Sequence, residues 1–139
     1  MTERPLVTGF PHVGIAVSDL ARMLAVLREM GFELVRREEL PAYGGWSNVV
    51  GVGEHRLELL EASRPDGAFG QYLERRGPGL HHLCLAVRDI EESIALADRL
   101  GLRLVDRTPM RDSDGLRVFV HPSSMQGVLV GLVQPHDGR

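Results

Sequence analysis

The chain repeats itself, and this repeat limits the folds that it can adopt. When residues 11–40 are moved forward by 70 positions, nine of the thirty residue pairs are identical. The identical pairs include His12/His82, Asp19/Asp89 and Gly31/Gly101. A second match, offset by 73 positions, sets RLELLE (56–61) against LVGLVQ (129–134) and places Glu58 opposite Gly131. We therefore expect two copies of one structural unit, the second of which lacks a carboxylate that the first one carries.

Composition narrows the class of protein. With 139 residues, the chain has enough material for one domain with a sizeable core. Its 16 basic and 19 acidic residues are interspersed and give a net charge of −3, which argues against nucleic acid as a partner. No apolar run approaches the roughly 18 residues of a membrane span and no export signal is visible, so we expect a cytoplasmic protein without a membrane partner. The single cysteine, Cys84, excludes an internal disulfide.

Each copy has the pattern of a βαβββ unit. In the first copy we expect a strand at 12–17, a helix that begins after Asp19 and stops at Gly31, and strands at 32–40, 46–52 and 55–62. In the second copy we expect a strand at 82–87, a helix after Asp89, and strands at 102–107, 116–121 and 127–133.

One such unit leaves most of a sheet face uncovered, because a single short helix cannot cover four strands. We therefore predict one α+β domain over residues 1–139, with modules at about 10–62 and 80–135 joined by a short helical linker at 63–79. The two tandem βαβββ modules would form a curled, mostly antiparallel sheet of eight strands around a cavity.

Strand alternation indicates which side chains share the cavity. Residues two apart on a strand face the same side, so His12 should share a face with Gly14 and Ala16. His82 should likewise share a face with Cys84 and Ala86, and Glu58 can face the same cavity. The small residues beside the two histidines would leave room for a ligand.

These residues carry a likeness to a known family. The paired segments HVGIAVSDL and GLHHLCLAVRDIE resemble the vicinal-oxygen-chelate superfamily of glyoxalases, bleomycin-resistance proteins and extradiol dioxygenases. Within it the chain is most similar to methylmalonyl-CoA epimerases, over roughly residues 10–135. The segments that carry this similarity are REELP (37–41), HRLELLEA (55–62), LERRGPGLHHL (73–83) and HPSSMQGVLVGLVQ (121–134).

The resemblance implies one divalent metal ion, with Co, Ni, Mn, Zn and Fe all open as its identity. Carried over position by position, its ligands would be His12, Glu58 and His82, whereas the fourth ligand position falls on Gly131. The resemblance also implies a second carboxylate on the third strand, where this chain has Ser47, or Asn48 if the register differs by one residue. A homodimer and a small-molecule substrate are implied as well.

Both carboxylates of the epimerases are thus missing, and epimerisation needs an acid and a base on opposite faces of one carbon. Another group would have to move the proton. The candidates for this role, or for a contact with the substrate, lie on or near segments that rim such cavities: Tyr43, Trp46, Asp112 and Asp114. The candidate residues of the substrate pocket are Tyr43, Trp46, Ser47, Asn48, Cys84 and Gly131.

Three functions compete at this point. The first is a metal-dependent enzyme of the isomerase or lyase type, which acts on a small oxygen-bearing substrate, such as an acyl-CoA, through a metal-stabilised enolate. The second is a non-haem Fe(II) dioxygenase, because two histidines and one carboxylate form the ligand set of such enzymes. The third is a non-catalytic protein that binds a small molecule, as resistance proteins do.

Overall fold

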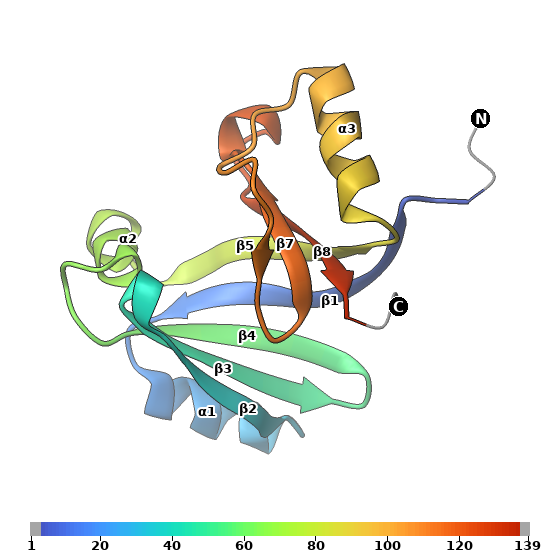
Figure 1. The fold of residues 1–139 in the computed structure, drawn as a ribbon. Helices are drawn as coiled ribbons and strands as arrows, with labels where there is room; N and C mark the ends of the chain where they lie inside the picture. The colour runs from blue at the N-terminus through green and yellow to red at the C-terminus, as the bar shows by residue number, and fades with distance from the viewer. Residues whose placement is uncertain (1–3, 137–139) are drawn as a thin grey trace. The chain divides into compact units, whose positions relative to one another are not determined.

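The computed structural model describes residues 4–136, which contain eight strands and three α-helices. These residues divide into two compact units. The first unit, here called the N-terminal module, contains residues 12–81. The second, called the C-terminal module, contains residues 82–136 together with residues 4–11. The hydrogen-bonded strand order is β2-β3-β4-β1-β5-β8-β7-β6, which confirms an α+β fold of eight strands (Figure 1).

The N-terminal module follows the expected βαβββ order. Its elements are the part of β1 (Val7–Val17) from His12 onward, α1 (Leu20–Glu29), β2 (Glu33–Leu40), a 3-10 turn (Pro41–Tyr43), β3 (Gly45–Val52), β4 (His55–Ala62) and α2 (Ala68–Arg76). Strands β2, β3 and β4 pair antiparallel, whereas β1 pairs parallel to β4. The Asp19 side chain accepts the Arg22 N–H and thereby caps α1.

The C-terminal module repeats this arrangement in a shorter form. Its elements are the part of β5 (Gly79–Val87) from His82 onward, α3 (Ile90–Leu100), β6 (Met110–Arg111), β7 (Gly115–Val120), a 3-10 turn (Pro122–Ser124) and β8 (Val130–Pro135). Strand β8 pairs parallel to β5 and antiparallel to β7. The sheet is therefore mixed, although most of its described strand pairs are antiparallel. Asp89 caps α3 by accepting two backbone N–H groups, and Gly101 ends it at φ 70°.

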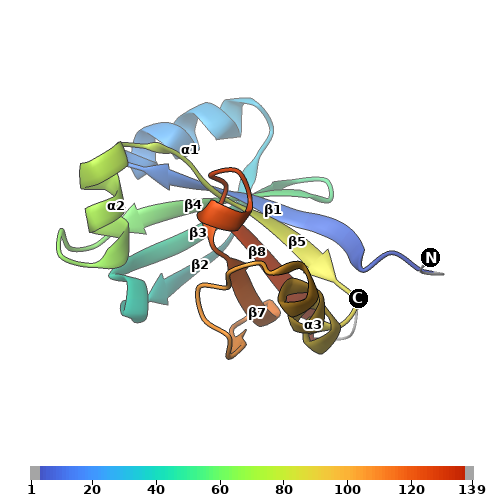
Figure 2. The same ribbon diagram turned by 90° about the horizontal axis from the view of Figure 1, so that it is seen from above.

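Each module buries one face of its strands beneath its own helix. In the N-terminal module, α1 lies against the strands (Figure 1). Its Leu27 joins Val50 and Leu59 in one apolar cluster. In the C-terminal module, α3 lies beside β7 and β8 (Figure 2), and Ile90 and Ala97 enter its two apolar clusters. The opposite face of each module carries the strand side chains that do not pack against the helix. His12 lies on this face in the N-terminal module, and His82 lies on it in the C-terminal module.

One expected strand is not formed as such. Residues 102–107 contribute only an isolated bridge between Leu104 and Val120, and the paired segment that follows is the two-residue β6. The chain turns away where the Asp106 carboxylate accepts the Thr108 N–H at 2.9 Å, one residue before Pro109. The last strand begins at Val130 rather than at residue 127, and the first begins already at Val7.

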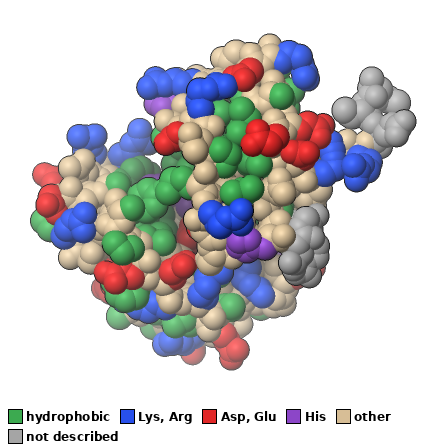
Figure 3. Space-filling model, viewed as in Figure 1, with side chains coloured by type: hydrophobic (Ala, Val, Ile, Leu, Met, Phe, Trp, Pro, Cys, Tyr) green, Lys and Arg blue, Asp and Glu red, His purple; other side chains and the backbone are tan. Residues whose placement is uncertain are grey.

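Acidic and basic side chains are interspersed on the face drawn in Figure 3, in keeping with the small net charge. Among residues 4–136, no helix combines the length and the apolar character needed to cross a membrane.

Candidate metal centre

The N-terminal module holds a row of polar side chains on the face opposite α1. Register decides their placement, because Glu58 on β4 pairs with Gly14 of β1 on one side and with Val49 of β3 on the other. His12 lies two residues before Gly14, and Ser47 lies two residues before Val49. Strand alternation therefore brings His12, Ser47 and Glu58 to one face.

These three side chains are in contact. The Ser47 hydroxyl donates a hydrogen bond of 2.6 Å to Glu58 Oε2. The other carboxylate oxygen, Oε1, lies 3.3 Å from His12 Nε2. His12 is 7% exposed and Ser47 is 2% exposed, so the group is shielded from solvent. The two oxygens of Glu58 consequently have different partners.

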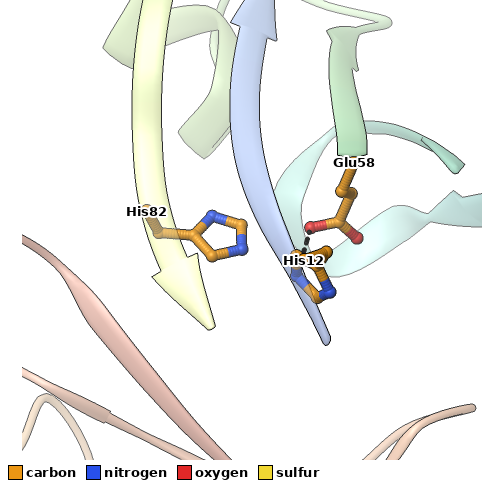
Figure 4. A group of neighbouring side chains, drawn as sticks. All are labelled: His12, Glu58 and His82. Carbon is orange, nitrogen blue, oxygen red and sulfur yellow. Dashed lines mark ion pairs between the residues drawn. The ribbon is translucent and has the colours of Figure 1, made fainter. Parts of the chain in front are cut away.

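His82, on β5, belongs to the same group of potential ligands. One ligand atom from each of His12, Glu58 and His82 lies within 4.8 Å of the other two (Figure 4). Two imidazole nitrogens and one carboxylate oxygen form a donor set that suits Zn, Fe, Co, Ni or Mn. The residues present therefore fit a divalent transition metal.

The C-terminal module has no carboxylate at the position that matches Glu58. Gly131 pairs with Cys84 on β5 and with Phe119 on β7. A methyl group at Gly131 would lie only 3.0 Å from Phe119 Cε1, so the aromatic ring takes the room of a side chain there. The same ring stands edge-on to His82, with 5.9 Å between the ring centroids. His82 thus has an apolar neighbour on this face.

A buried arginine lies on the same face of the C-terminal module. Arg117 is 9% exposed and donates to Asp112 Oδ2 at 2.7 Å, Asp114 Oδ2 at 3.0 Å and Cys84 Sγ at 3.2 Å. Burial by itself would lower the pKa of Arg117. The hydrogen bond to Asp112 and the electrostatic effects of Cys84, Asp112 and Asp114 outweigh burial and raise this pKa above its ordinary value. Both loop aspartates are therefore engaged with a permanently charged guanidinium.

The other pocket candidates lie at different places. Asn48 and Trp46 occupy the face that carries α1, because they alternate with Ser47. Asn48 is fully buried, accepts from Arg37 and donates to the Leu59 carbonyl, while Arg37 stacks on Trp46.

Of the two residues considered for the lost carboxylate, Ser47 is the one beside Glu58. Tyr43 stacks on Phe69, and Cys84 is fully buried beneath Arg117.

Sequence reasoning missed Arg117 and Phe119. The signal was present in the segment LRVFVH (116–121), where alternation places both residues on the face opposite Val118 and Val120. A charged residue at an inward strand position, three residues after one aspartate and five after another, is typical of a buried ion-pair network.

Known proteins are similar to this chain in sequence and fold. Residues 11–120 match the model of the glyoxalase/bleomycin resistance protein/dioxygenase superfamily. An ethylmalonyl-CoA/methylmalonyl-CoA epimerase of Cereibacter sphaeroides is 32% identical over 130 residues, which cover 88% of this chain and 95% of the relative.

Solved structures show the same likeness. The methylmalonyl-CoA epimerase of Mycobacterium tuberculosis superposes with a TM-score of 0.87 at 31% identity, covering 97% of this chain and 93% of that one. A Streptomyces coelicolor methylmalonyl-CoA epimerase variant in complex with 2-nitronate-propionyl-CoA gives a TM-score of 0.82 at 31% identity, covering 91% and 94%. The chain is therefore a member of the glyoxalase/bleomycin resistance protein/dioxygenase superfamily, built on the scaffold that methylmalonyl-CoA epimerases share.

Proposed function

We propose that the protein is a metal-dependent enzyme of the isomerase or lyase type that acts on the carbonyl of a small acyl substrate. The observation that carries this proposal is the group formed by His12, Glu58 and His82, whose ligand atoms lie within 4.8 Å of one another. Both histidines are 7% exposed, and shielded imidazoles beside a carboxylate are typical of a metal centre rather than of a surface cluster.

His12, Glu58 and His82 would hold the metal. A divalent ion held there would act as a Lewis acid on a substrate carbonyl and so favour enolisation. The neighbouring side chains would fix the orientation of the Glu58 carboxylate, and the burial of this group would keep water away from it. The similarity to epimerases of CoA esters supports an acyl-CoA thioester as the substrate class.

Ordinary epimerisation is not part of the proposal. That reaction needs a proton donor and a proton acceptor on opposite faces of one carbon. The Ser47 hydroxyl already donates its hydrogen bond to Glu58, and Gly131 has no side chain. If the enzyme removes an α-proton, the acceptor is a different group.

Exchange of solvent deuterium tests the proposal directly. The purified chain would be loaded separately with Co, Ni, Mn, Zn or Fe(II) and incubated in deuterium oxide with methylmalonyl-CoA or propionyl-CoA. We expect metal-dependent incorporation of deuterium next to the thioester carbonyl and none with His12→Ala. Absence of exchange with every metal would overturn the assignment of acyl-CoA enolisation.

A second candidate is a non-haem Fe(II) oxygenase. The specific observation in its favour is the ligand set itself, two histidines and one carboxylate, which is the set of that enzyme class. Anaerobic loading with Fe(II), followed by measurement of oxygen uptake on catechol-like compounds, separates it from the first candidate. A protein that binds its ligand without either reaction would instead be a binding protein.

We also propose a homodimer, by analogy with the family. Sedimentation equilibrium measures this independently of catalysis, and a mass near one chain of 15.4 kDa would contradict it.

A further inference from the structure

The contact between Ser47 and Glu58 gives the two oxygens of one carboxylate different partners. Ser47 pairs across the strands with Leu60, and Glu58 pairs with Val49, so the two side chains are diagonal neighbours on one face. The hydroxyl reaches Oε2 at 2.6 Å, a distance typical of a strong hydrogen bond to a carboxylate. Oε1 is left toward His12 Nε2, 3.3 Å away.

We propose that Ser47 is a positioning residue, which holds Glu58 so that Oε1 alone is presented to a cation. This inference rests on the metal centre of the proposed function. A hydroxyl suits the task because it can donate a hydrogen bond to Oε2, whereas a second carboxylate at position 47 would repel Glu58. The position where the epimerase resemblance implies an acid/base residue is here used to orient a ligand.

The C-terminal module makes this orientation decisive. Arg117 and Phe119 pair with Val133 and Gly131, as Ser47 and Val49 pair with Leu60 and Glu58. At the place that matches Glu58 there is only Gly131, with the Phe119 ring 3.0 Å from where a Cβ would stand. Position 131 therefore supplies no oxygen ligand from a side chain, and Glu58 is the sole carboxylate of the proposed ligand set.

Removing the Ser47 hydroxyl should act on the metal through Glu58. Without its donor, Oε2 would be a buried acceptor lacking this partner, and the carboxylate could turn or bind with both oxygens. Loss of a partner that orients a metal ligand typically lowers metal affinity by about 10- to 100-fold. We expect a weakening of this size for Ser47→Ala.

The test is a titration of the whole chain with Co²⁺, read both as affinity and as the visible absorption spectrum of the bound ion. Ser93→Ala is the matched control, because Ser93, in α3, is also a serine with 2% exposure, and its hydroxyl donates to the carbonyl of the capping residue Asp89. Ser47→Ala should bind Co²⁺ about 10- to 100-fold more weakly and with an altered spectrum. Ser93→Ala should match the wild type in both readouts.

Three outcomes are informative. If the wild type binds Co²⁺, His12→Ala does not, and Ser47→Ala equals the wild type in affinity and spectrum, the positioning role is overturned while the metal centre stands. If the wild type binds no Co²⁺, or His12→Ala binds it equally well, both are overturned. Ser47→Thr keeps a hydroxyl, and a spectrum closer to the wild type than that of Ser47→Ala supports the proposal.

Discussion

At the scale of single residues, the contact between Gly131 and Phe119 explains why a side chain at position 131 would be difficult to accommodate. A methyl group there would lie 3.0 Å from the ring edge, which is too close for an ordinary van der Waals contact. Gly131→Ala should therefore destabilise the protein by about 1 kcal/mol, at the lower end for an overpacked site. In a Phe119→Leu background the penalty should shrink, because the ring edge is gone. Urea denaturation of the four proteins in this cycle measures the coupling, and strictly additive effects would contradict it.

Arg117 provides a second prediction at this scale. Its guanidinium is buried, and its partners Asp112 and Asp114 are 34% and 30% exposed. Arg117→Met should lower the free energy of unfolding by about 2 kcal/mol, less than for a fully buried pair because solvent screens the aspartates. Arg107→Met is the control, since its ion pair with Asp98 lies on the surface, and we expect no measurable loss. Equal effects of the two substitutions in urea denaturation would refute the distinction.

The sequence could identify the proposed ligands but not how their neighbours hold them. The repeat and the family resemblance both point to His12, Glu58 and His82, so the sequence alone is enough to propose them as ligands. The choice between Ser47 and Asn48 stayed open, because a shift of one residue exchanges the two faces of a strand. The register shift between Leu34 and Arg36 on the neighbouring strand is a feature that alternation alone does not reveal.

At the scale of elements, the two copies differ in their second strand although the sequences look alike. In the first copy ELVRREEL forms the eight-residue β2, which pairs with β3 along its length. In the second copy LRLVDR (102–107) forms only the bridge at Leu104. Side-chain propensity is similar in the two segments, so pairing and the turn at Asp106 decide the outcome. Helices were easier to predict, because their caps are local.

Those caps allow a comparison between the copies. Asp89 accepts the N–H groups of Glu91 and Glu92 at 2.9 and 3.1 Å, whereas Asp19 accepts only that of Arg22 at 3.0 Å. Asp89→Ala should cost about 1 kcal/mol of stability, and Asp19→Ala should cost less, because fewer donors lose their partner. Urea denaturation of both variants measures the difference. A larger loss for Asp19→Ala would show that hydrogen-bond number does not set the strength of these caps.

At the scale of the whole molecule, the proposed ligands are divided between the modules. His12 and Glu58 belong to the N-terminal module, and His82 is the first residue of the other module's main segment. A metal bound by all three would therefore depend on both copies of the repeat being folded, even though each copy has its own helix and apolar core. The broken symmetry at Gly131 would make the first copy the source of the carboxylate.

This division leads to a prediction about thermal stability. A ligand that binds only the native state adds about 2.7 kcal/mol when its free concentration is 100 times Kd. For a chain of this length, that corresponds to a rise in the melting temperature of roughly 10 °C. We expect a Co²⁺-dependent rise of this order in differential scanning calorimetry, and its reversal by a chelator. His82→Ala should abolish the rise as fully as His12→Ala does, because each removes one of three ligands of a single ion. If His82→Ala kept the full rise while His12→Ala lost it, the ion would be held by the N-terminal module alone.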